Sequence, residues 1–148
     1  MKLMQWLGRV LLLPALLCAA STSTAQPRPG ECPQPRFTGK APDEYYLRKS
    51  PLEAPDEKTG ARLYAGSGND GSCAICHGKR GDGKGALSKL YDPPPRNFAC
   101  AMTVIGVPDG QLFWIIRFGS PGTGMPPHPQ LSENDVWQLV AYLRTLAK

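Results

Sequence analysis

The sequence lacks the features that would direct it toward several common protein classes. Its 17 basic and 12 acidic residues leave a net charge of only +5 over 148 residues, which is too weak to indicate a nucleic-acid or membrane-surface protein. No segment alternates apolar and polar residues as a strand does, and no repeat is visible. Only two histidines are present. Together these absences leave one small domain of helices and loops as the expectation.

A long apolar run is also missing. The longest, Val10–Ala20, is about half of what a membrane-spanning helix requires. Positive charge precedes it at Lys2 and Arg9, and small residues follow it up to Ala25, an order typical of a secretion signal. We expect a signal peptide over 1–25 that is cleaved before position 26. An uncleaved anchor or a lipid on Cys18 is the alternative.

The remaining chain, residues 26–148, keeps 15 of the basic and all 12 acidic residues, for a net charge of +3. We expect no membrane span in it and no nucleic-acid partner. Proline and glycine are abundant, with 16 of each in the whole chain. Five prolines fall between 26 and 42, which predicts an extended tail, and Pro51 and Pro55 predict an irregular lead-in up to residue 56.

Capping residues and apolar spacing predict three helices. They cover 57–65, 110–118 and 132–147, and their expected caps are Asp56, Asp109 and Ser132. Ser132 and Asp135 together form a pair like a capping box. An apolar stripe follows on the last helix, at Val136, Leu139, Val140 and Leu143. A glycine-rich stretch, 66–71, ends the first helix.

The motif with the clearest chemistry is Cys73-Ala74-Ile75-Cys76-His77, which fits the C-x-x-C-H pattern for covalent haem attachment. Thiols three residues apart can each reach one vinyl group, and the next residue then offers an imidazole to the iron. A zinc site would need a second ligand pair, and a thioredoxin-like pair would need a βαβ setting. We therefore predict one haem c bound by Cys73 and Cys76, with His77 as an iron ligand. A phosphate-binding loop at Gly78–Lys84 is excluded because Gly85 stands where Ser or Thr is needed.

From about residue 57 to 148, the chain resembles a class I c-type cytochrome of the small bacterial periplasmic kind. The resemblance implies an all-α cytochrome c fold with three to four helices wrapped around one covalently attached haem. The domain would then cover 57–148, after a signal at 1–25 and a proline-rich tail and lead-in at 26–56. One departure is the lengthened link at 66–71 between the first helix and the haem motif.

The resemblance also implies roles for particular residues. The segment Gly122–Pro127 resembles the family's methionine loop, so Met125 is the expected second axial ligand, with Met102 and His128 as rivals. A proline carbonyl, from Pro93, Pro94 or Pro95, is expected to accept a hydrogen bond from the far ring nitrogen of His77. On the crossing of the first and last helices, the expected residues are Gly60, Tyr64 and Tyr142.

Two cysteines, Cys32 and Cys100, are left over after haem attachment. In an exported chain we expect them to form a disulfide, although free thiols or a link to a partner are alternatives. Arg96 and Arg117 are candidates to face the haem propionates. A docking ring for an acidic partner is a further hypothesis, and a solvated face explains it equally well. Its residues would be Lys79, Arg80, Lys84 and Lys89.

The ligand set predicts a periplasmic one-electron carrier with no catalytic residues, acting with redox partner proteins. The alternative within this class is an electron-accepting cytochrome subunit of a periplasmic dehydrogenase or oxidase complex. A haem peroxidase or gas sensor is the rival from another class, and it would require the iron to lack Met125 or to release it easily.

Overall fold

The structure is a computed structural model that describes residues 28–66 and 72–148. The expected signal peptide and most of the glycine-rich link, 67–71, lie outside the described residues. The elements in order are α1 (Asp43–Tyr46), α2 (Glu57–Ala65), α3 (Cys73–His77), the 3₁₀ turn η1 (Ser88–Leu90), α4 (Ala101–Val104), α5 (Asp109–Phe118) and α6 (Glu133–Leu146). Within those two ranges there is no strand, and the all-α class is confirmed.

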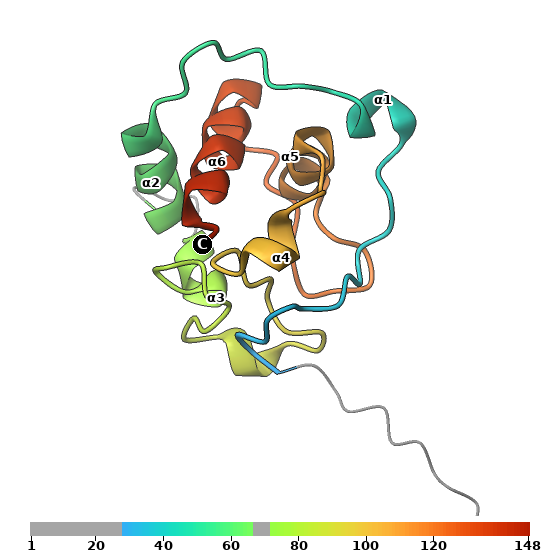
Figure 1. Cartoon of the computed structure of the whole chain (residues 1–148), viewed down its shortest axis with the longest axis vertical. Helices are drawn as coiled ribbons and strands as arrows, with labels where there is room; N and C mark the ends of the chain where they lie inside the picture. The colour runs from blue at the N-terminus through green and yellow to red at the C-terminus, as the bar shows by residue number, and fades with distance from the viewer. Residues whose placement is uncertain (1–27, 67–71) are drawn as a thin grey trace, which may run out of the picture.

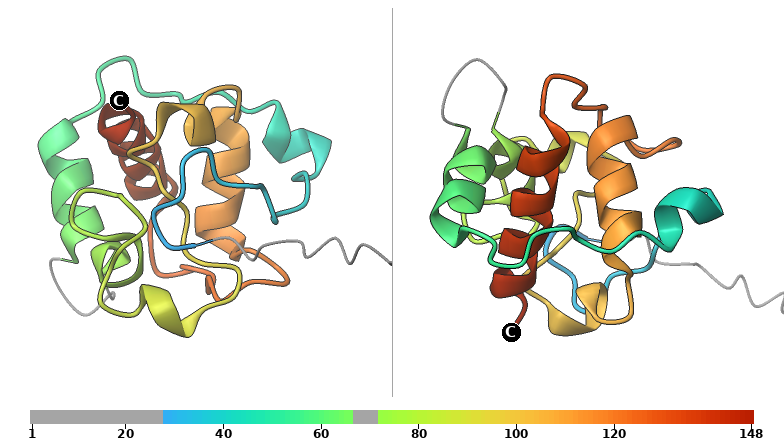
Figure 2. Two further views of the ribbon diagram at one scale, coloured as in Figure 1. Left: turned by 60° about the horizontal axis from the view of Figure 1, so that its bottom comes forward. Right: turned by 90° about the horizontal axis from the view of Figure 1, so that it is seen from above.

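Helix α6 forms the centre of the fold and lies between α2 and α5 (Figures 1 and 2). The capping box predicted at its start is present, with the Ser132 hydroxyl accepting from the backbone N–H of Asp135. Its predicted apolar stripe is buried, and Trp137 joins it with only 1% of its surface exposed. Apolar burial along this stripe is the main force holding the helices together.

Helices α2 and α6 cross at Gly60, as the resemblance implied. A Cβ placed on Gly60 would lie 2.5 Å from the backbone oxygen of Gln138 and 2.6 Å from the Cβ of Tyr142. Only a residue without a side chain allows the two backbones to approach this closely. The rings of Tyr64 and Tyr142 pack beside the crossing, with centroids 5.4 Å apart.

Three details of the predicted secondary structure are wrong, and one of them is the short helix α4, which was not predicted. Asp109 does not cap α5; it is the first residue of the helix, after Pro108, and its carboxylate accepts from Arg144 of α6 at 2.6 Å and 2.9 Å. The lead-in also contains a helix, α1, which starts after Pro42 with two acidic residues in its first turn. Proline before a helix and acids in its first turn are start signals, but four residues are too few for apolar periodicity to appear.

The proline-rich segment is extended, as predicted, but lies along the surface of the helical domain. We call residues 30–41 the strap; it runs past α4 in Figure 1. The expected disulfide between Cys32 and Cys100 fastens one end. At the other end, the Gln111 side chain accepts from the N–H of Ala41 at 2.8 Å and donates to the carbonyl of Gly39 at 3.1 Å. No helix in the described part of the chain is long and apolar enough to span a bilayer.

Candidate functional site

Helix α3 carries the haem-attachment motif on barely more than one turn. The loop that follows folds back and donates to the last carbonyls of α3: Gly83 N–H to His77 at 2.8 Å, Gly85 N–H to Cys76 at 3.1 Å and Leu87 N–H to Ile75 at 3.0 Å. These bonds satisfy carbonyls that a helix end leaves without partners. The loop's N–H groups therefore serve α3 and do not form a cradle for phosphate.

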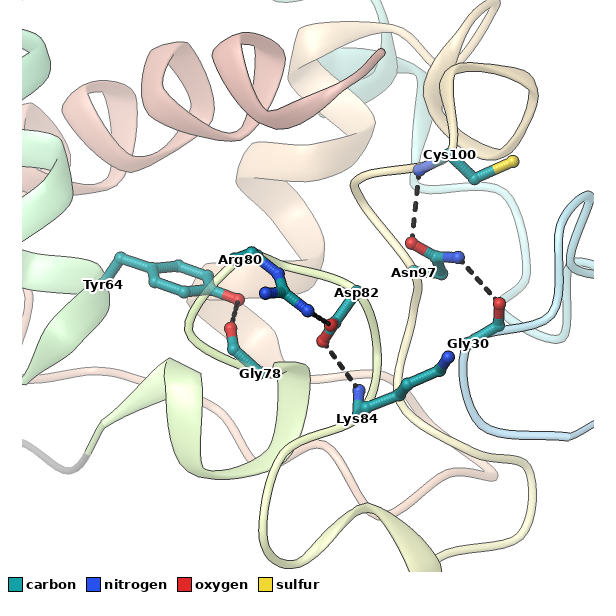
Figure 3. Close-up of polar contacts among 8 residues, drawn as sticks. All are labelled: Gly30, Tyr64, Gly78, Arg80, Asp82, Lys84, Asn97 and Cys100. Carbon is teal, nitrogen blue, oxygen red and sulfur yellow. Dashed lines mark hydrogen bonds and ion pairs between the residues drawn. The ribbon is translucent and has the colours of Figure 1, made fainter.

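Tyr64 fixes the end of α3 from the neighbouring helix α2. Its hydroxyl donates to the carbonyl of Gly78 at 2.8 Å, as Figure 3 shows. Because the phenol is buried, its pKa is raised well above the usual value, so it remains a neutral donor. The motif is thus held by both the loop after it and the helix before it.

A cavity of about 460 Å³ opens beside α3 and is lined by Cys73, Cys76, His77 and Met125. Its volume lies in the range of sites for small molecules and cofactors. The remaining wall is largely apolar and includes Phe98, Leu112, Ile116, Leu139 and Leu143. The folded chain therefore brings the four residues predicted to hold haem to one apolar cavity, although Met125 lies 48 positions after His77.

His77 is only 8% exposed, and two contacts fix its ring. The ring stacks on Phe98 with centroids 4.7 Å apart. Its Nδ1–H donates to the backbone carbonyl of Arg96 at 3.0 Å, which leaves Nε2 as the nitrogen for a metal. Burial lowers the pKa of His77, and the bond to Arg96 opposes this. A neutral imidazole is the form that ligates iron.

The expectation that a proline carbonyl accepts from His77 is wrong. The acceptor is the next residue, Arg96, while the carbonyls of Pro94 and Pro95 each accept from Gln34 Nε2 at 3.2 Å. These two carbonyls therefore bond to a strap residue. The sequence placed the segment correctly, but only the folded chain determines which of its carbonyls meets the imidazole.

Cys73 and Cys76 are both free thiols and partly buried. Burial raises the pKa of the Cys73 thiol. Within the two described ranges, no group of three or more His, Cys, Asp or Glu side chains could hold a metal ion. The zinc alternative therefore finds no donor set there, whereas two thiols beside an apolar cavity fit covalent attachment of a macrocycle.

Met125 lies in a loop that is held together by hydrogen bonds between its own residues. The N–H of Ser120 donates to the Met125 carbonyl at 3.1 Å, and the N–H of Met125 donates to the Thr123 hydroxyl at 3.2 Å. The rival Met102 lies on α4 with 67% of its surface exposed and does not line the cavity. His128 does line it, with Nδ1 donating to the Ile116 carbonyl at 3.3 Å.

The two arginines considered for the propionates hold backbone carbonyls. The guanidinium of Arg96 donates to Pro35 at 2.7 Å and Thr103 at 2.8 Å, and that of Arg117 donates to Pro129 at 2.8 Å and to Leu131. Arg96 also lines the cavity. Contact with propionates stays a prediction for both, as does the docking ring.

Comparison with known proteins also indicates a c-type cytochrome domain. A profile of the family described as cytochrome c oxidase, cbb3-type, subunit III matches residues 55–143. A solved structure described as the Kuenenia stuttgartiensis reducing HAO-like protein complex Kustc0457/Kustc0458 is 24% identical, with a TM-score of 0.55, and covers 70% of this chain. The match covers 49% of that chain, so the present chain spans about half its length.

Another structure, described as the c-type cytochrome NirC, is 28% identical over 60% of this chain and 86% of its own, with a TM-score of 0.39. The search of curated proteins found no match. At 24% identity, the likeness to the Kuenenia stuttgartiensis structure concerns the fold alone, and it agrees with the all-α architecture described above.

Proposed function

The chain belongs to the family described as cytochrome c oxidase, cbb3-type, subunit III, and from this premise we propose that it is a periplasmic one-electron carrier with a single haem c. Membership implies a c-type cytochrome domain with covalently bound haem and a role in electron transfer. The observation that carries the finer proposal is that Cys73, Cys76, His77 and Met125 line one and the same largely apolar cavity.

Each residue has a distinct role in the proposal. Cys73 and Cys76 anchor the macrocycle covalently. His77 presents Nε2 to the iron while Phe98 and the Arg96 carbonyl fix the ring. Met125 would supply the second iron ligand from its closed loop. When bound, the haem iron supplies the one-electron couple, and a Met/His pair raises its reduction potential.

If His77 and Met125 both held the iron, no coordination position would remain for a substrate, which favours a carrier over a peroxidase or gas sensor. The apolar wall keeps water from the centre, so a change of charge there requires little solvent rearrangement. We assign no catalytic residue. The periplasmic location rests on the signal-like residues 1–25 and on the need for oxidising conditions to form the Cys32–Cys100 disulfide.

The test is Met125→Ala in secreted, haem-loaded protein, with Met102→Ala as the matched control. Met125→Ala should keep the covalent haem but abolish the weak long-wavelength band of methionine-ligated ferric haem and lower the reduction potential. Met102→Ala should change neither, because Met102 is exposed and outside the cavity. An unchanged band in Met125→Ala would contradict the ligand assignment. Intact mass without one added haem would contradict the whole proposal.

A second candidate is a cytochrome subunit that accepts electrons within a dehydrogenase or oxidase complex. The family description, which names a subunit of an oxidase, favours it. Size-exclusion chromatography of native periplasmic extract separates the two functions. A freely diffusing carrier elutes near the mass of one mature chain, residues 26–148, which is below the 16.0 kDa of the full sequence, and a subunit elutes with its complex.

A further inference from the structure

The peptide group between Arg96 and Asn97 is hydrogen-bonded at both ends. Its carbonyl accepts from His77 Nδ1 at 3.0 Å, and its N–H donates to the Gln34 side-chain oxygen at 2.9 Å. In a trans peptide the carbonyl and the N–H point in opposite directions. One peptide group therefore connects the imidazole of His77 on one side with the amide of Gln34 on the other.

Gln34 is buried, with 5% of its surface exposed, and all its side-chain polar atoms are used. Its Nε2 donates to the carbonyls of Pro94 and Pro95, and its backbone N–H donates to the Thr103 hydroxyl at 3.2 Å. The Arg96 guanidinium donates in return to the Gln34 carbonyl at 3.2 Å. Gln34 thus contacts the chain on both sides of the peptide group that meets His77.

The strap is fastened close to Gln34, so the amide is held in place. The Asn97 side chain donates to the Gly30 carbonyl at 3.1 Å and accepts from the Cys100 N–H at 3.2 Å, as Figure 3 shows. The Cys32–Cys100 disulfide adds a covalent link two positions before Gln34. Hydrogen bonds that are joined in a chain of this kind polarise one another.

We propose that Gln34 is a positioning residue for His77, acting through the Arg96–Asn97 peptide group to set the strength of the iron's imidazole ligand. The inference rests on the proposed function, because it requires His77 to bind haem iron. By accepting from the N–H, Gln34 polarises the peptide and makes its carbonyl a better acceptor. A stronger bond to Nδ1–H makes the imidazole a stronger ligand, which stabilises ferric iron and lowers the reduction potential.

The chain offers a matched control in Gln111. It is also buried, and from α5 its side chain holds the strap by accepting from the N–H of Ala41 and donating to the carbonyl of Gly39. Neither of these partners contacts His77. A purely structural clamp therefore predicts the same consequences for both glutamines, whereas the proposed relay predicts a change of potential for Gln34 alone.

The experiment measures the midpoint potential of haem-loaded wild type, Gln34→Met, Gln34→Glu and Gln111→Met. Gln34→Met keeps the volume but removes the acceptor, so the midpoint potential should rise. At a fixed solution potential, this rise corresponds to about a two- to fourfold decrease in the ferric-to-ferrous ratio. Gln34→Glu, at a pH where the carboxyl is ionised, loses the donor bonds to Pro94 and Pro95 but is a stronger acceptor for the N–H of Asn97, and should lower the potential. Gln111→Met should leave it unchanged, even if the protein is less stable.

A second readout is the Nδ1–H proton of His77 in nuclear magnetic resonance spectra of the reduced protein. Its resonance should move upfield in Gln34→Met, as a weaker hydrogen bond requires, and stay in place in Gln111→Met. An unchanged potential in Gln34→Met, or an equal shift in Gln111→Met, overturns the inference. If Gln34→Met does not accumulate, Gln34→Glu decides: a potential at or above wild type overturns it.

Failure of this inference is distinguishable from failure of the proposed function. Wild type that carries covalent haem but does not respond to Gln34 removes only the positioning role. Wild type without haem on Cys73 and Cys76 removes both the carrier and the role of Gln34.

Discussion

The helices and the strap are held by different kinds of interaction. Helices α2, α5 and α6 bury apolar side chains against one another, and the residues that do so recur at helical spacing. The strap buries Gln34 and Ala41, but it is fixed mainly by hydrogen bonds and a disulfide to residues some 60 to 70 positions away in sequence. Burial is non-directional, while each of these polar bonds requires its own partner.

This difference separates two kinds of effect, one on the free energy of unfolding (stability) and one on the reduction potential of the haem (tuning). A change in the helical core alters how much apolar surface is buried and so acts on the free energy of unfolding. A change in the strap acts on segment 94–103, which includes the carbonyl that contacts His77. We therefore expect a change in the strap to reach the haem site directly, and a change at a helix residue that does not line the cavity to reach it only through unfolding.

The largest expected effect comes from the double substitution Cys32→Ser and Cys100→Ser. The disulfide closes a loop of 68 residues, and on the chain-entropy model its loss lowers the free energy of unfolding by roughly 4 kcal/mol. Urea denaturation followed by far-ultraviolet circular dichroism measures this loss. Helix content before unfolding should stay the same, because α2, α5 and α6 do not depend on the strap for their packing.

A loss of helix content in the folded double variant would contradict the distinction between strap and helices, because it would show that the helices depend on the strap for their packing. The two single serine variants serve as controls for free-thiol chemistry, and they should be as unstable as the double variant.

The next effect is at the helix crossing, where Gly60→Val should cost about 3 kcal/mol, near the upper end for overpacking. The added side chain would meet the Gln138 backbone and Tyr142 directly, so α2 and α6 must separate. Thermal unfolding measures the change. Ala65→Val at the exposed end of α2 is the control, and a similar loss there would attribute the effect to β-branching instead of the crossing.

The smallest effect is expected at the helix cap, where Ser132→Ala should lower the free energy of unfolding by about 1 kcal/mol. The hydroxyl of Ser132 accepts from Asp135 N–H at 3.1 Å, and alanine leaves that donor to water. Ser132→Thr keeps the acceptor and should restore most of the stability in the same denaturation assay. A reduction potential altered by Ser132→Ala would contradict the separation of stability from tuning.

Local sequence signals predicted the helices well because caps and apolar spacing act within a few residues. The helix at 57–65 has the predicted bounds, and the one predicted at 132–147 forms as Glu133–Leu146. The pairing of Cys32 with Cys100 followed from counting the cysteines that haem attachment leaves over. Helix α1 was missed because one turn is too short to show a period.

The contacts of single polar groups were not predictable in this way. Gln34 sits among prolines in a segment interpreted as an extended tail, and no local signal marks it as buried. Arg96 follows three prolines that were equally plausible acceptors for His77, and in the folded chain the carbonyls of Pro94 and Pro95 accept from Gln34 instead. Every residue has a backbone carbonyl, so the residue type does not indicate which carbonyl will accept the bond.

The sequence by itself determined the all-α class, the haem-attachment motif and the positions of the main helices, because these depend on residue type and spacing over a few positions. Only the tertiary structure decided that Met125 joins His77 at one cavity, that the Arg96 carbonyl receives the imidazole, and that Gln34 lies behind that peptide group. These contacts join residues that are distant along the chain, and a hydrogen bond requires a distance and an angle that only the folded chain provides.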